Sequence, residues 1–254
     1  MTKKEWLISI TVGIVLGMLG GLLGVPRLLQ AKPVGAVSTA DVALLATLTS
    51  HEKWNTLQGA ADIVWYLPNG GTQEYINTFA IQQPNKVYTK AKSVDGAGAD
   101  SEWISDGNKA FDIDPRTKTY TDTSLPTFSK DLSMLPTTLE AAETGNVIYR
   151  HSFGMLISAP VGEYLYPQWF SQGGGTYSLA GEDILLGRKV WVIDHKKNAH
   201  DVTAWIDKET GVILKYSQKV DGKLFVDVTF TSFQANPLLD GALFSLPSDV
   251  KHGR

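Results

Sequence analysis

The chain has 254 residues, a formal net charge of −3, an isoelectric point of about 5.9 and no cysteine. The absence of cysteine excludes disulfides, thiol catalysis, cysteine metal sites and a lipid-modified cysteine. The slightly acidic balance, without any run rich in lysine or arginine, argues against a nucleic-acid partner.

An uncharged stretch, residues 6–25, follows Lys3 and Lys4 near the N-terminus. About twenty residues with a rise of about 1.5 Å each span roughly 30 Å, the hydrocarbon thickness of a bilayer. We therefore expect an N-terminal transmembrane anchor in residues 1–30, with a cleaved signal peptide as the alternative, and a linker in residues 31–37. A long polar domain after a first span favours export, to the periplasmic or cell-wall side of the membrane.

Three glycines, Gly13, Gly17 and Gly21, lie four residues apart on one side of this predicted helix. Such spacing lets two membrane helices approach closely, which suggests a helix dimer or a membrane-protein partner. The other interpretation is that glycine is simply common in membrane helices.

Residues 38–250 are expected to form one domain, which begins with a helix capped by Ser38 or Thr39. The three- and four-residue spacing of apolar positions predicts a buried side with Val42, Leu45 and Leu48, and with Trp54 as a further candidate.

From residue 59 onwards the apolar period changes to two, which is typical of strands with one buried face. Short turns with glycine, proline or asparagine divide this part into six predicted strands: residues 59–67, 75–81, 87–94, 101–105, 109–113 and 117–122. Residues 125–172 lose the alternation and suggest short helices near 128–143, 146–157 and 161–170, followed by a glycine hinge at 173–175. Five more strands are predicted: residues 176–185, 188–195, 202–207, 212–220 and 223–233.

This order predicts an α+β fold, in which a strongly curved antiparallel half-barrel of about eleven strands carries helices on its concave face. The seven tryptophans give such a sheet large apolar side chains that suit the wall of a ligand cavity. The same side chains also suit a ligand-free core, and composition alone favours that interpretation.

Five segments together carry a family resemblance. QPNKV at 83–87 precedes DGNKAFDIDPRTK at 106–118, AWIDKETGVILK follows at 204–215, and FTSFQANP and LDGALFSLP close the domain at 230–237 and 239–247. In this order and spacing they resemble the LolA-like lipoprotein carriers and the RseB-like regulators. The resemblance implies an eleven-stranded half-barrel, closed by a helical lid, whose apolar cavity takes acyl chains of lipids or lipoproteins. It implies no catalysis.

The sequence departs from this family in two ways. The carriers are free periplasmic shuttles, whereas this chain has a predicted anchor. They also hold the lid with an arginine in an early strand, whereas residues 59–81 contain none. We therefore expect local binding, handover or envelope sensing beside one membrane, rather than shuttling between two.

The leading hypothesis places a lipid or an acylated lipoprotein between the sheet and a lid formed by residues 125–170. The expected wall residues are apolar and mostly aromatic: Ile63, Trp65, Phe79, Trp103, Trp169, Trp191 and Trp205. The alternative is an RseB-like regulatory module that binds a membrane signalling protein and has no role in lipid transport.

Candidate chemistry is sparse, and we expect no enzyme, no metal and no cofactor. A metal site could be sought at His195, His200 and Asp201. The turn between the two histidines contains lysines that would repel a cation, so we expect a polar turn instead. Asp112 and Asp114, with Asp106 or Asp122, offer carboxylates for calcium, but solvated carboxylates at hairpin ends are the simpler interpretation.

Overall fold

The computed structural model describes residues 38–96, 98–130, 135–143, 151, 154, 156–157 and 159–253. The helices in these residues are short: α2 (Thr39–Leu48), α3 (Leu139–Glu143) and α4 (Gly162–Leu165), with the 3₁₀ helices η1 (Ser50–Glu52), η2 (Thr127–Lys130), η3 (Pro167–Gln172) and η4 (Gly241–Phe244). The predicted anchor, the linker and the three glycines at 13, 17 and 21 lie outside the described residues. Within the described residues no helix is long and apolar enough to cross a membrane.

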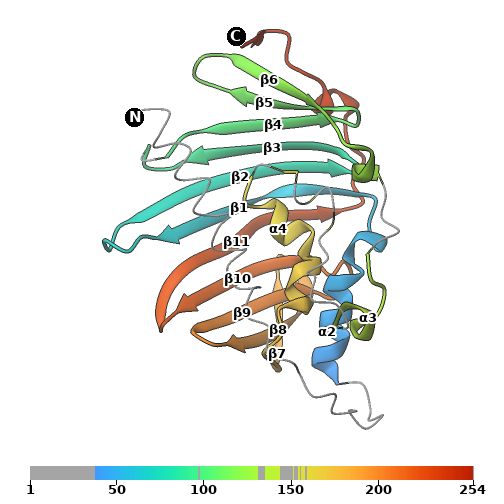
Figure 1. Cartoon of the computed structure of the whole chain (residues 1–254), viewed down its shortest axis with the longest axis vertical. Helices are drawn as coiled ribbons and strands as arrows, with labels where there is room; N and C mark the ends of the chain where they lie inside the picture. The colour runs from blue at the N-terminus through green and yellow to red at the C-terminus, as the bar shows by residue number, and fades with distance from the viewer. Residues whose placement is uncertain are drawn as a thin grey trace.

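The domain is built on one twelve-stranded sheet. Its first six strands are β1 (Thr56–Tyr66), β2 (Thr72–Gln82), β3 (Lys86–Ser93), β4 (Ser101–Asp106), β5 (Lys109–Asp114) and β6 (Thr119–Ser124). The others are β7 (Thr176–Leu185), β8 (Arg188–Lys197), β9 (His200–Asp207), β10 (Ile213–Val220), β11 (Lys223–Ala235) and β12 (Lys251–His252). Their spatial order is β12-β6-β5-β4-β3-β2-β1-β11-β10-β9-β8-β7 (Figure 1).

Two antiparallel meanders, β1–β6 and β7–β11, are joined where the first strand pairs with β11. In this register Ile63 lies opposite Val228 on one side and opposite Tyr75 on the other. All eleven predicted strands are present, and the curved antiparallel sheet is confirmed. The twelfth strand was not predicted: β12 has two residues and pairs in parallel with β6.

The helix α2 begins as predicted but buries a different side. Ser38 accepts a hydrogen bond from the Asp41 amide and the Asp41 carboxylate accepts one from the Ser38 amide, which forms a capping box. Leu48 and Trp54 are buried as expected, but Val42 and Leu45 are 42% and 38% exposed. The buried side consists mainly of small residues, Ala40, Ala43, Ala46 and Thr47 with Leu44. Small side chains let a helix approach the sheet ends closely, which the apolar spacing alone did not reveal.

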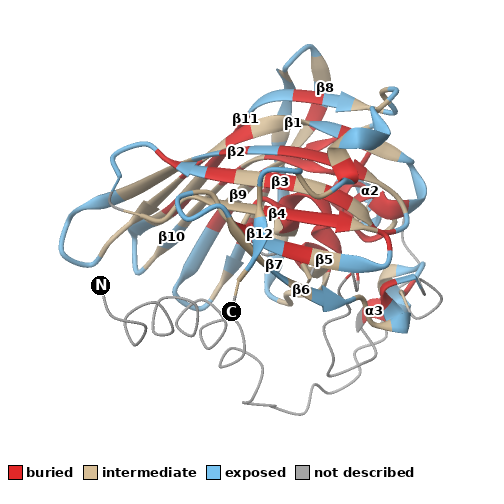
Figure 2. Ribbon diagram, turned by 90° about the horizontal axis from the view of Figure 1, so that it is seen from above, coloured by how far each residue is buried: buried red, intermediate tan, exposed pale blue. Residues whose placement is uncertain are grey.

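The sheet has two differently covered faces (Figure 2). We call the face that carries Ile63 and Tyr216 the inner face; its side chains belong to the main core, together with α2 and residues 159–170. Ile104, Phe111 and Ile113 form a second core on the outer face, where Leu246 and Val250 of the C-terminal segment pack against them. The neighbours Trp103 and Ile104 illustrate the alternation, because the first belongs to the main core and the second to the outer one.

Candidate functional site

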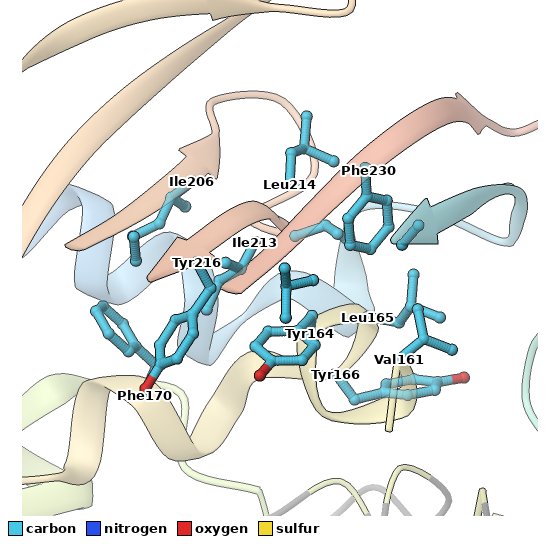
Figure 3. Close-up of a cluster of buried hydrophobic side chains, with 14 of the residues drawn as sticks. Val161, Tyr164, Leu165, Tyr166, Phe170, Ile206, Ile213, Leu214, Tyr216 and Phe230 are labelled. Atoms are coloured by element: carbon cyan, nitrogen blue, oxygen red, sulfur yellow. The ribbon is translucent and has the colours of Figure 1, made fainter. Parts of the chain in front are cut away.

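Residues 159–172, which contain α4 and η3, lie against the inner face at β10 and β11, and we call them the lid segment. Val161 and Leu165 are fully buried and Phe170 is 1% exposed. Figure 3 shows Val161, Tyr164 and Leu165 facing the strand residues Ile213, Tyr216 and Phe230. The lid's own side chains therefore fill this part of the inner face.

Aromatic contacts dominate the packing of the lid segment. The Tyr164 and Trp169 rings lie 5.3 Å and 6.0 Å from the Tyr216 ring, between centroids. Burial raises the pKa of Tyr164 and of Tyr216, so both phenols stay neutral at physiological pH. The predicted helix at 161–170 is present as two short pieces, because Pro167 starts the new 3₁₀ helix η3. The predicted helix at 146–157 falls largely outside the described residues.

Side chains, rather than paired strands, attach the lid segment to its surroundings. In the described part of the chain, its backbone hydrogen bonds run within the segment, such as Leu165 N to Val161 O and Tyr166 N to Gly162 O. The Tyr177 hydroxyl of β7 donates to the Phe170 carbonyl. The lid segment can therefore separate from the sheet without breaking a strand ladder.

The glycine segment after the lid is anchored, although the sequence suggests a hinge. The Lys197 ammonium donates to the Gly173 carbonyl, and the His195 ring bonds the Gly174 carbonyl with 2.6 Å between Nε2 and O. His195 also stacks on Tyr177, with 4.2 Å between ring centroids. Burial lowers the pKa of His195, which keeps the ring neutral.

A second group of polar contacts joins the lid segment to the end of α2. The Gln168 amide Nε2 lies 3.2 Å from His51 Nδ1, and His151 stacks on Tyr166 with 4.0 Å between ring centroids. The Gln83 amide holds this end in place by donating to the backbone oxygens of His51 and Trp54. We call His51, His151, Tyr166 and Gln168 the histidine clasp.

The other end of the site depends on a buried ion pair that sequence reasoning missed. Arg188 makes two hydrogen bonds of 2.9 Å to the Asp207 carboxylate, which is fully buried and also accepts from Thr210. Gly211 follows in the left-handed region at φ +74°, and a Cβ there would lie 2.0 Å from the Ala46 oxygen of α2. Only glycine allows this turn to touch the helix. No local pattern signals the Arg188–Asp207 pair, because the two residues are brought together by the β8–β9 register.

The structure brings most of the expected wall residues together on the inner face. Ile63, Phe79 and Trp103 are buried in the main core, and Trp65 packs against it from β1. Trp169 belongs to the lid segment, and Trp191 lies opposite Ile206 at the far side of the sheet.

The side chain of Trp205 lies on the outer face of the sheet, unlike those of the other expected wall residues in the strands. Its neighbours Ala204 and Ile206 are fully buried in the main core, so the alternation of the strand directs Trp205 to the outer face. There the Lys215 ammonium lies 4.5 Å from the centre of its ring. Trp205 is also partly buried against the main core, so its place in a ligand wall stays a prediction.

The inner face is not uniformly apolar. Asn77 and Thr89 are buried on β2 and β3, and within the described residues Asn77 Oδ1 and Thr89 Oγ1 have no hydrogen-bond partner. Two surface depressions lie elsewhere. One of about 240 Å³ is bordered by polar residues of β8–β10 such as Asp194, Thr203 and Ser217, and one of about 180 Å³ lies beside Gly107 and Leu125.

The candidate metal clusters do not form among the described residues, where no group of three histidines or carboxylates is arranged to hold an ion. His195 is buried against Tyr177, whereas His200 is exposed and bonded to Gln218. Asp114 accepts hydrogen bonds from the amides of its own turn, and Asp122 pairs with Lys109 and His252. These carboxylates stabilise hairpin ends.

No protein-family model and no curated protein matches the chain. Among solved structures, MucB is similar over 85% of this chain and 66% of its own, with 16% identity and a TM-score of 0.45. LprF from Mycobacterium bovis is similar over 85% and 100%, with 11% identity and a TM-score of 0.44. A LolA superfamily protein from Nitrosomonas europaea is similar over 82% and 98%, with 11% identity and a TM-score of 0.34. MucB and MucA of Pseudomonas aeruginosa have also been solved as a complex.

Proposed function

We propose that this protein is a membrane-anchored, extracytoplasmic domain that binds an acyl chain of a lipid or lipoprotein on its inner face, in the place of the lid segment. The observation that supports this most is the lid packing. Val161, Leu165 and Phe170 present an almost fully buried apolar surface to the sheet, yet the described backbone of the segment pairs with no strand.

An acyl chain can replace such a segment at little net cost in apolar burial. Each large side chain that leaves the core gives up about 1.5–3 kcal/mol, and about 0.8 kcal/mol returns for each ligand methylene that moves from water to the inner face. An acyl chain of about twelve to eighteen carbons that is otherwise exposed to water thus offsets the removal of several lid side chains. The ligand role of Ile63, Trp65, Phe79 and Trp103 is part of this proposal.

Photo-crosslinking of the full chain in lipid nanodiscs tests the proposal. A phospholipid with a diazirine on its acyl chain is activated, and the modified residues are mapped by mass spectrometry. We expect crosslinks on inner-face residues such as Ile63 and Phe79, and none on the outer-face residue Trp205. Crosslinks confined to residues 6–25 would contradict the proposal and favour the regulatory module that binds a partner protein.

A locked lid provides the matched control. The chain has no cysteine, so Tyr164→Cys combined with Tyr216→Cys gives a unique pair that a short bismaleimide bridges. The bridged protein should lose the inner-face crosslinks, whereas each single variant treated with the same reagent should retain them.

A further inference from the structure

Two buried histidines lie where η1 meets the lid segment. His51 is 8% exposed and His151 is fully buried, and their ring centroids are 5.7 Å apart. Protonation of these imidazoles is costly, because a buried cation loses hydration and two charged rings this close repel each other.

The bond between His51 and the lid depends on the neutral ring. The Gln168 amide nitrogen, which only donates, faces His51 Nδ1, so a neutral Nδ1 accepts in this arrangement. Protonation places a hydrogen on Nδ1, so this hydrogen bond is lost and the Gln168 side chain has to rearrange. His51 is fixed on the other side because its backbone oxygen accepts from Gln83, so the lid is the element free to move.

His151 acts on the same segment through stacking. Its ring lies nearly parallel to that of Tyr166, at an interplanar angle of 22°, and Tyr166 in turn contacts Trp54 at 5.3 Å between centroids. An imidazolium in this buried stack loses hydration, which makes protonation of the closed state costly.

We propose that the histidine clasp makes the lid segment acid-sensitive, so that protonation of His51 and His151 releases the lid and exposes the inner face. The inference rests on the proposed function for the meaning of lid release, and it names the regulation of the same site.

The charged groups around the two histidines favour release of the lid in acid. Among the described residues, Glu52 alone stabilises a charged His51 in the closed state; its carboxylate lies 3.9 Å from His51 Nε2, and its side chain is exposed. Lys53 follows in the chain and interacts with Glu52 and Asp207. Tyr166, Gln168 and Gln83 bring no charge. Burial lowers the pKa of His51, although Glu52 opposes the shift, and burial together with His51 lowers the pKa of His151 to about 3.

The sign and size of the effect follow from these shifts. Both histidines have a lowered pKa in the closed state, so opening takes up protons and becomes more favourable as the pH falls below about 6.5. For His151, with a pKa of about 3 when closed and about 6.5 in water, the opening equilibrium at pH 5 increases about 30-fold.

Hydrogen exchange of the full chain in nanodiscs tests the clasp without any added ligand. Protection factors, corrected for the intrinsic pH dependence of exchange, are measured between pH 7.5 and pH 5 for the Leu165 and Tyr166 amides. We expect about a 30-fold loss at these lid amides and no comparable loss at Ile63 and Phe79 in the sheet. Equal protection at both pH values would overturn the proposal.

Variants identify the responsible residues. His151→Phe keeps an aromatic ring on Tyr166 and should remove most of the acid-dependent loss. His51→Gln removes the second titratable ring together with its repulsion of a charged His151 and should also reduce the loss, so it tests the clasp if the first variant fails to fold. His200→Gln changes an exposed histidine that is bonded to Gln218 and should retain the loss. An unchanged loss in His151→Phe or His51→Gln, or its disappearance in His200→Gln, would contradict the clasp.

The two proposals fail separately. Lid amides that open in acid, together with a protein that never crosslinks an acyl chain, leave the clasp intact and reject lipid binding. Crosslinks on the inner face, together with lid amides whose protection does not change with pH, support lipid binding and reject the clasp.

Discussion

The two faces of the sheet are covered in different ways. On the outer face the C-terminal segment joins the sheet itself: β12 pairs with β6, and the Lys251 and Gly253 amides donate to the Lys118 and Tyr120 carbonyls. On the inner face the lid segment buries more aromatic surface, but side-chain contacts carry the attachment. Backbone pairing ties the outer cover to the sheet, whereas the inner cover can separate without breaking a strand ladder. This difference is why we place the binding event on the inner face.

The largest effect is expected from Phe170→Ala. Phe170 is 1% exposed and contacts Tyr177 and Trp169, and truncation of a buried phenylalanine costs about 3–5 kcal/mol. Because the described backbone of the lid pairs with no strand, the cost should appear as lost exchange protection in residues 162–172, while the strands remain protected. The matched control is Phe128→Ala, since Phe128 is 50% exposed and its loss should change little. Strands that lose protection together with the lid would contradict the separation of the two covers.

A smaller effect is expected from Leu246→Ala in the outer cover. Leu246 is half-buried against the outer core, so its truncation should lower the free energy of unfolding by about 1–2 kcal/mol. Urea unfolding measures the loss. Because this cover belongs to the sheet, the change should affect global unfolding and leave the protection of the lid amides relative to the strands unchanged. Selective opening of the lid in this variant would show that the two covers are coupled.

The smallest effect is expected from Lys118→Ala. The Lys118–Asp249 ion pair has a separation of 2.8 Å, but both side chains are more than 60% exposed, and exposed pairs are screened by water and salt. The melting temperature should stay within measurement error at both low and high salt. A clear salt-dependent decrease would show that ion pairs, rather than backbone pairing, hold the C-terminal segment.

The strands and the helix cap could be predicted because they depend on neighbouring residues. Alternation over β1–β6 and β7–β11 and the Ser38 cap are local patterns, and the structure confirms them. The burial of Leu48 was predicted correctly and that of Val42 and Leu45 wrongly, because a neighbour of α2 is the glycine turn at Gly211, more than 150 residues away in the sequence. The orientation of Trp205 depends on the register between β9 and β10, which shifts near Ile213. The clasp was missed for the same reason: His51, His151 and Gln168 show no common motif until the lid folds onto α2.

The central claim is that an acyl chain and the lid segment compete for the same inner face. Hydrogen exchange at pH 7.5, with and without a bound acyl-chain lipid, tests it most directly. Competition predicts that the lipid removes protection at the Leu165 and Tyr166 amides and preserves it at Ile63 and Phe79. Lipid that binds while the lid amides remain fully protected would show that the ligand lies elsewhere and would contradict the account.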